Sequence, residues 1–194
     1  IIDLGTNSVR FDVHQLGPGK KVRQLHREKL MIRLGQGVFL DGKLDREAVR
    51  RTLQAFASFQ RTARYLRAEK IVAFGTSALR EASDSGKLLS SIRAKSAIEV
   101  RVISGPEEAK LIAAGVLSNE RTAKGRFALV DIGGGSTEIS ICRGKKILHC
   151  DSFPLGTARL QQVFLKSSPP RVNGKDPVDQ LRSYIRSAVL PKLS

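Results

Sequence analysis

The sequence Asp131-Ile132-Gly133-Gly134-Gly135-Ser136 repeats a pattern found near the start of the chain, in Asp3-Leu4-Gly5-Thr6-Asn7-Ser8. Both stretches read Asp-x-Gly-x-x-Ser. Each lies between a short apolar run and a run in which apolar and polar residues alternate, which is typical of a turn between two β-strands. The alternation after residue 136 excludes a dinucleotide-binding glycine loop, because that loop must be followed by a helix. We therefore interpret both stretches as the tips of β-hairpins.

Tips of this composition suit phosphate binding. Glycine permits positive φ angles and lets backbone N–H groups come close to an anion, while a serine hydroxyl adds a donor. The candidate phosphate-binding residues are Gly5, Thr6, Asn7, Ser8, Gly133, Gly134, Gly135 and Ser136. A single loop of this kind is more simply an ordinary turn, but two loops in matching context favour one phosphate chain held between them. Asp3 and Asp131 precede the loops and would repel phosphate, so we expect a divalent cation, Mg²⁺, between carboxylate and phosphate.

The residues around the first loop predict an α/β unit. Residues 1–34 read as three antiparallel strands, and Asp45 is placed to cap a long amphipathic helix. Thr76-Ser77 caps the next helix, and apolar runs at 71–74 and 98–103 read as strands. Helix and strand thus alternate, as in a mixed α/β layer.

A second unit with the same beginning follows the polar stretch at residues 118–126. Residues 127–153 read as three further strands, and two helices follow them. We therefore divide the chain into a first lobe at residues 1–122 and a second lobe at residues 123–194.

The composition favours a folded protein with an anionic ligand. The chain has 34 Lys and Arg against 18 Asp and Glu, a formal net charge of +16, and 41% hydrophobic residues. Cys142 and Cys150 are the only cysteines, so neither a disulfide framework nor a zinc site is expected. No apolar run is long enough to span a bilayer, and no leader pattern opens the chain. We expect a cytoplasmic protein without a membrane partner.

Four segments carry a resemblance to a known family. They are residues 3–10, 75–82, 102–109 and 130–138. In order and separation they are similar to the landmark segments of the exopolyphosphatase/guanosine pentaphosphate phosphatase family. A match spread over most of the chain is far more specific than either glycine loop alone.

The resemblance implies an actin-like ATPase (ribonuclease H-like) fold, with two lobes around a cleft and Mg²⁺ as the cofactor. It also implies an enzyme that removes the terminal phosphate of inorganic polyphosphate or guanosine pentaphosphate. The family's second lobe continues with more strands, more helices and a further glycine-rich segment, which does not occur before Ser194. We therefore expect this chain to contain the first lobe and only the start of the second. Because it opens at Ile1 inside a predicted strand and without Met, we also expect residues upstream.

Glu107 and Glu108 are adjacent carboxylates at the start of a predicted helix. With Ser104 as the N-cap, Glu107 completes a Ser-x-x-Glu capping box. Glu108 lies one turn before Ile112, along the flank of the helix that meets the core. The resemblance implies that a Glu of this segment is the catalytic base, and we assign that role to Glu108. The alternative is a solvated Glu favoured by the helix dipole.

The other candidate site residues are one arginine and three carboxylates. Arg80 follows the Thr76-Ser77 cap by one turn, and its guanidinium suits bidentate phosphate binding. Arg10 is a weaker candidate of the same kind. Asp3, Asp131 and Glu138 are the candidate ligands of the metal or of its water.

Several functions remain in competition. The leading one is a Mg²⁺-dependent phosphatase acting on polyphosphate, guanosine pentaphosphate or both. The first alternative is a non-catalytic polyphosphate or nucleotide sensor on the same scaffold, and a sugar or acid kinase of the same superfamily is another. A basic nucleic-acid-binding module ranks last, because Tyr65 and Tyr184 are too few for base stacking. The oligomeric state is open, with a homodimer among the alternatives.

Overall fold

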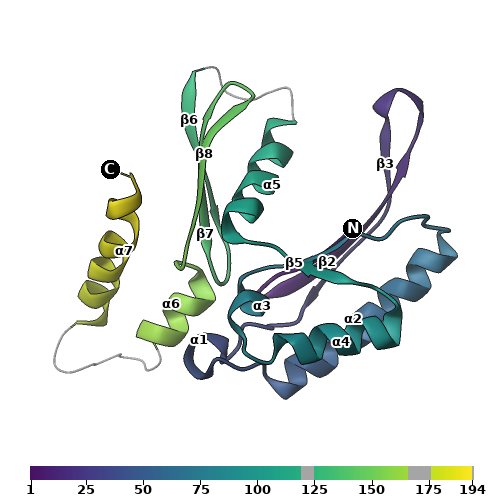
Figure 1. Cartoon of the computed structure of the whole chain (residues 1–194), viewed down its shortest axis with the longest axis horizontal. Coiled ribbons are helices and arrows are strands. Elements are labelled where there is room, and N and C mark those ends of the chain that lie inside the picture. Colours follow the sequence, from purple (N-terminus) through teal and green to yellow (C-terminus); the bar gives the residue numbers. More distant parts are fainter. Residues whose placement is uncertain (119–124, 166–175, 194) are drawn as a thin grey trace. The chain divides into compact units, whose positions relative to one another are not determined.

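The computed structural model describes residues 1–118, 125–165 and 176–193 (Figure 1). The chain forms two compact units, Ile1–Ile103 and Ser104–Ser194, each built around its own β-sheet. None of the described helices combines the length and the apolar composition needed to cross a bilayer.

A five-stranded mixed sheet organises the first unit, with the strand order β3-β2-β1-β4-β5. The strands are β1 (Ile2–Leu4), β2 (Ser8–Leu16), β3 (Val22–Met31), β4 (Ala73–Gly75) and β5 (Val100–Val102). The first three strands are antiparallel because short turns join them, whereas β4 and β5 run parallel to β1 because helices intervene. The predicted three-stranded start of the unit is therefore confirmed.

Helices of the first unit pack on one face of this sheet. They are α1 (Val38–Asp41), α2 (Arg46–Tyr65), α3 (Ser77–Glu81) and α4 (Ser85–Ser96), with a short 3-10 turn at Pro18–Lys20. Asp45 caps α2 as predicted, since its carboxylate accepts a hydrogen bond from the Ala48 N–H at 2.9 Å. Phe11 of β2 stacks on Phe59 of α2 at 4.7 Å between ring centroids, and both rings are buried. Each such ring contributes about 1.5–3 kcal/mol by burial, so these contacts fix α2 on the sheet.

The segment after Thr76 differs from the prediction of one helix. Thr76 is the N-cap residue of α3, but its side chain makes no capping hydrogen bond. Helix α3 ends at Glu81 because Ala82 takes an extended conformation, with φ −71° and ψ 121°. A second helix, α4, then begins at Ser85. The run Ser83-Asp84-Ser85-Gly86 at the break consists of turn and N-cap residues, a signal for the division that the prediction did not use.

A three-stranded antiparallel sheet, in the order β6-β7-β8, organises the second unit. Its strands are β6 (Arg126–Ile132), β7 (Thr137–Arg143) and β8 (Lys146–Phe153), and its helices are α5 (Gly105–Leu117), α6 (Thr157–Phe164) and α7 (Pro177–Leu193). Helix α5 packs on β7 and β8 (Figure 1). The lobe boundary predicted at residues 122 and 123 falls outside the described residues and stays a prediction, while the compact units divide before α5.

The two cysteines lie on neighbouring strands of this sheet as free thiols, as expected. Cys142 is fully buried on β7, and Cys150 on β8 is half-buried. Burial raises the pKa of the Cys142 thiol, and the nearby Cys150 adds to the effect. Cys142 therefore stays protonated at neutral pH, as a packing residue.

Replacing Ala97 by glycine should stabilise the first unit. Ala97 is exposed and ends α4 in the left-handed region, with φ 53°. Because glycine adopts this φ without a Cβ clash, we expect the free energy of unfolding to rise by roughly 0.5–1 kcal/mol. Ala94→Gly, at an exposed position inside the same helix, is the matched control and should lower it by about 1 kcal/mol. Urea unfolding followed by circular dichroism measures both; equal effects of the two exchanges would contradict the explanation.

Candidate functional site

The two glycine loops share one backbone geometry. The Gly5 N–H donates to the Ser8 carbonyl at 3.0 Å, and the Gly133 N–H donates to the Ser136 carbonyl at 2.9 Å. A Cβ on either glycine would lie 3.1 Å from that same carbonyl oxygen, which is tighter than ordinary packing. The sequence repeat therefore corresponds to a repeated structure, in which one amide of each loop closes the turn.

In the second loop the carbonyls point toward the start of α6. The Gly133 carbonyl accepts from the Thr157 N–H at 2.9 Å, and the Gly134 carbonyl accepts from the N–H groups of Ala158 and Arg159 at 2.8 and 3.1 Å. The Gly135 carbonyl accepts from the side-chain Nε of Arg159 at 2.7 Å.

These bonds fix where the loop amides point. In a planar trans peptide the C=O and the following N–H lie on opposite sides. The N–H groups of Gly134, Gly135 and Ser136 therefore point away from α6, and within the described part of the chain none of them donates to another group. Successive amides directed to one side form an anion-binding nest.

The first loop is held in a comparable way. The Thr6 carbonyl accepts from the Gly35 N–H at 2.8 Å, and the Asn7 carbonyl accepts from Ile32 and Arg33 at 3.0 and 2.8 Å. The N–H groups of Asn7 and Ser8 therefore point away from residues 32–35. The Thr6 side chain is only 5% exposed, and a Cβ at Gly35 would lie 2.3 Å from its Cγ2. The N–H groups of Asn7 and Ser8 are thus better candidates for anion binding than the Thr6 side chain.

The carboxylates differ between the two loops. Asp131 stands directly opposite Glu138 in the β6–β7 register, whereas Asp3 stands directly opposite Arg10 in the β1–β2 register. Opposite charges on facing strands attract and like charges repel. Beside the second loop, two negative carboxylates therefore repel each other, and a bound cation would reduce this repulsion. Beside the first loop, the negative Asp3 faces the positive Arg10, so their charges compensate each other.

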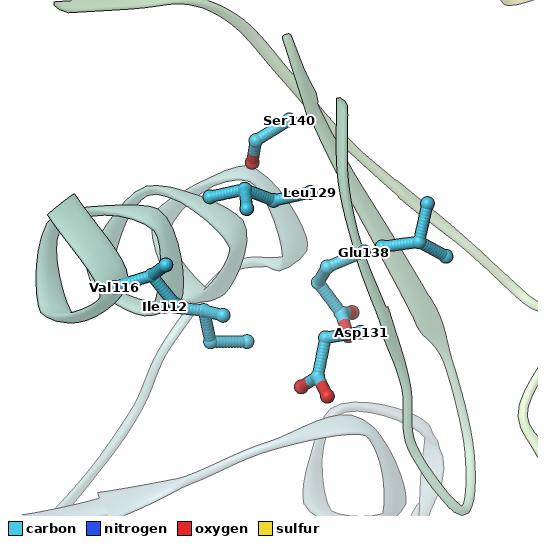
Figure 2. A pocket seen from close by; sticks show the side chains of 7 residues that line it. Ile112, Val116, Leu129, Asp131, Glu138 and Ser140 are labelled. Atoms are coloured by element: carbon cyan, nitrogen blue, oxygen red, sulfur yellow. The ribbon is translucent and has the colours of Figure 1, made fainter. Parts of the chain in front are cut away.

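Asp131 and Glu138 border a cavity of about 130 Å³ on the side of the sheet that faces α5. Figure 2 shows both carboxylates in this space beside Ile112. Glu138 is 3% exposed, and its Oε1 accepts a hydrogen bond from Ser152 Oγ at 2.7 Å. Ser152 also contacts the start of α5, because a Cβ at Gly105 would lie 2.5 Å from its Cβ.

The donor chemistry of this pair fits Mg²⁺. The ion takes one or two protein carboxylates and fills its other positions with water and phosphate oxygens. Among the residues that the structure describes, no group of three or more His, Cys, Asp or Glu could hold a metal by itself. Asp131 and Glu138 therefore match a Mg²⁺ site that is completed by solvent and ligand, and the assignment of Asp3 to the same ion stays a prediction.

Glu108 lies on the first turn of α5, in the same unit as this pair. Ser104 caps the helix as predicted, with its Oγ accepting from the Glu107 N–H at 3.3 Å. Glu108 is half-buried and lies one turn before Ile112, which borders the cavity. The helix therefore carries Glu108 on the flank that leads to Asp131 and Glu138.

Arg80 belongs to the first unit, and its guanidinium has a backbone contact. Its Nη1 donates to the Ile103 carbonyl at 3.0 Å, and this bond orients the guanidinium group. Arg10 is exposed and lies between Asp3 on β1 and Lys29 on β3. The phosphate-binding roles of both arginines stay predictions.

Sequence reasoning missed the residues that support the loops. Gly156 is one of them, because a Cβ there would lie 2.3 Å from backbone atoms of Gly134 and Gly135. Arg159, Gly35 and Ser152 are the others. For Gly156 and Arg159 the available signal was the run Leu155-Gly156-Thr157, in which a glycine marks the start of α6, whereas the prediction began that helix near Leu155.

Comparisons with known proteins agree on one family. The Ppx/GppA phosphatase family model matches residues 13–193. Exopolyphosphatase 2 of Mycobacterium tuberculosis is 33% identical over 202 aligned residues, covering 99% of this chain and 61% of that protein. Exopolyphosphatase 1 of Mycobacterium leprae is 29% identical, with coverages of 96% and 54%.

Solved structures give the same relationship. An exopolyphosphatase from Cytophaga hutchinsonii superposes with a TM-score of 0.89 at 30% identity, covering 98% of this chain and 60% of that one. The Aquifex aeolicus Ppx/GppA family member gives 0.73 at 26%, covering 96% and 59%. The predicted actin-like fold is confirmed, and the chain spans about three fifths of the length of these structures.

Replacing Asp131 by asparagine should stabilise the protein in the absence of divalent metal. Removing one charge of the Asp131–Glu138 pair relieves repulsion, and we expect the unfolding midpoint in EDTA to rise by about 1–3 °C. Asp3→Asn is the matched control and should lower the midpoint, because Asp3 faces Arg10. Added Mg²⁺ should stabilise the wild type more than Asp131→Asn. Differential scanning fluorimetry tests all of these, and a fall in the midpoint for both variants in EDTA would contradict the assignment.

Proposed function

The chain belongs to the Ppx/GppA phosphatase family, and we propose that it carries part of the active site of a phosphohydrolase that releases the terminal phosphate of inorganic polyphosphate. The observation that carries the proposal is the second loop. Its three N–H groups point to one side, and the Asp131–Glu138 pair stands where the two flanking strands meet it. Related exopolyphosphatases of 33% and 29% identity support the substrate class.

The loop amides supply what phosphoryl transfer needs most. Charge on the transferred phosphoryl group spreads over its oxygens in the transition state, and catalysis depends on donors that are oriented in advance. The N–H groups of Gly134, Gly135 and Ser136 are held in one direction by α6, so they can bind these oxygens without reorganisation. The net charge of +16 adds a general attraction for the polyanion.

The carboxylates divide into two roles. Asp131 and Glu138 would hold Mg²⁺, which supplies charge neutralisation and polarises the phosphate oxygens that it contacts. Glu108 is the proposed general base: it orients a water molecule and accepts its proton as the water attacks the terminal phosphorus. The bridging P–O bond to the penultimate phosphate breaks in the same step, and the shortened phosphate chain leaves with the electron pair. Glu108 is preferred to Glu107 because it lies one turn before Ile112, which borders the cavity that holds Asp131 and Glu138.

Guanosine pentaphosphate is a second proposed substrate. It presents a terminal anhydride phosphate with the same charge and geometry as the end of a polyphosphate chain, so the same amides could bind it. The family match favours hydrolysis over the sugar or acid kinase alternative. The non-catalytic sensor remains the alternative that experiment must separate.

Glu108→Gln should abolish turnover and preserve binding. Loss of a general base costs about 100-fold or more in rate, while the uncharged amide leaves the loops intact. Glu107→Gln is the matched control on the same turn and should keep phosphate release within a few-fold. Orthophosphate release from polyphosphate by the full-length protein gives the rate, and fluorescence anisotropy with labelled polyphosphate gives the affinity. Turnover by Glu108→Gln within a few-fold of wild type would show that another group is the base.

A phosphate-release panel tests the substrate and the metal together. We expect the full-length protein to release orthophosphate from polyphosphate in the presence of Mg²⁺ and to stop when EDTA is added. Release from guanosine pentaphosphate under the same conditions would extend the substrate range. Saturable binding of both compounds with no release in any condition would establish the sensor instead.

A further inference from the structure

Arg159 of α6 holds the second loop through a charged side chain. Its Nε donates to the Gly135 carbonyl at 2.7 Å, and its own backbone N–H donates to the Gly134 carbonyl at 3.1 Å. Arg159 is half-buried, so the guanidinium is partly shielded from water. The residue therefore contacts two consecutive loop peptides, one through its backbone and one through its side chain.

The three loop carbonyls depend on the sequence of α6 to different degrees. The Gly133 and Gly134 carbonyls are held by backbone N–H groups, which almost any residue at 157–159 would supply, and Thr157 Oγ1 adds a longer hydrogen bond of 3.3 Å to the Gly133 carbonyl. The Gly135 carbonyl is held by a side chain, which only a long residue with an N–H donor can replace. The orientation of the Gly135–Ser136 peptide is thus the part of the loop that one side chain sets.

This peptide needs an external support because of its composition. Gly134 and Gly135 have no Cβ, so their backbone has many accessible conformations and the peptide planes between them can rotate. The close approach of Gly156 to Gly134 and Gly135 limits translation of the loop toward α6. Steric contact alone does not fix which way a carbonyl points, whereas a short charge-assisted hydrogen bond does.

In the first loop, backbone groups fix the direction of the carbonyls. The Thr6 and Asn7 carbonyls accept from the backbone N–H groups of Gly35, Ile32 and Arg33. Thr6 and Asn7 also carry Cβ atoms, which restrict their backbone conformations. The two loops therefore have similar amide directions but different sources of rigidity.

We propose that Arg159 is a positioning residue for the proposed phosphatase reaction: by holding the Gly135 carbonyl, it directs the Ser136 N–H toward an oxygen of the bound terminal phosphate. The inference rests on the proposed function, since the anion is the phosphate of that reaction. Arg159 acts through the loop and its role differs from that of a residue that touches the phosphate itself. Lysine would replace it only in part, because an ammonium lacks the planar, fixed donor geometry of guanidinium.

The test is a titration of the ¹⁵N-labelled chain with inorganic pyrophosphate in the presence of Mg²⁺, followed through its amide signals. In the wild type we expect the signals of Gly134, Gly135 and Ser136 to shift and saturate. In Arg159→Gln we expect the Gly135 and Ser136 signals to move before any anion is added, and the affinity to fall about tenfold or more. Arg159→Lys should recover part of that loss.

Arg182→Gln is the matched control for the lost charge. Arg182 is an exposed residue of α7 whose guanidinium pairs with Asp179 at 3.3 Å. This variant should bind pyrophosphate like the wild type and leave the loop signals unchanged. An equal loss of affinity in Arg182→Gln would show that net charge accounts for the effect and would overturn the inference.

The remaining outcomes separate the alternatives. Weaker binding by Arg159→Gln with unchanged free-state loop signals would mean that Arg159 contacts the anion directly, and would overturn the positioning role. Wild-type affinity in both Arg159→Gln and Arg159→Lys would also overturn it. If Arg159→Gln does not fold, Arg159→Lys decides alone, since a loss of two- to fivefold with shifted loop signals is expected. Wild-type protein that binds no pyrophosphate would instead contradict the proposed function.

Discussion

The planar trans peptide is the constraint on which both glycine loops depend. A carbonyl that is fixed by a hydrogen bond on one side leaves the next N–H pointing to the other side. Residues 32–35 fix the carbonyls of the first loop, and the start of α6 fixes those of the second. The amide directions on which the proposed anion binding depends are therefore set by residues outside each loop. Both loops also share one turn geometry, in which a glycine N–H donates to the carbonyl of the serine three residues later.

The two repeats share a backbone and differ in charge, and the difference gives them separate tasks. In the first unit Asp3 faces Arg10, so the two charges beside the loop compensate each other. In the second unit Asp131 faces Glu138, and Ser152 holds the buried Glu138 carboxylate in place. A site for a divalent cation therefore fits the second repeat better than the first. Helix α5 brings Glu108 to the same unit, so the proposed base and the proposed metal ligands share one sheet and one helix.

Local signals in the sequence predicted the parts of the fold that local chemistry controls. Asp45 and Ser104 were identified as caps because a short polar side chain before an apolar run is itself the cause of the helix start. The hairpins around Gly5 and Gly133 were predicted from the glycines at their tips and from the alternation of apolar and polar residues in the strand that follows each tip. The break between α3 and α4 was missed because Ala82 itself carries no signal for an extended conformation and the N-cap residues that follow it, Ser83 and Asp84, were not used. Gly156 and Arg159 were missed because they meet the second loop only after β7 and β8 have reversed the chain twice.

The contact between Gly105 and Ser152 links the geometry of α5 to that of the buried carboxylate. A methyl group at 105 would collide with Ser152, so the helix can approach the sheet only while residue 105 has no side chain. Shrinking Ser152 to glycine would make room, but it would also remove the hydroxyl that holds Glu138. Neither position can change size alone without cost to the other, so the two residues are structurally coupled. An exchange at this contact preserves the site only if it keeps both the space beside residue 105 and the hydroxyl that holds Glu138.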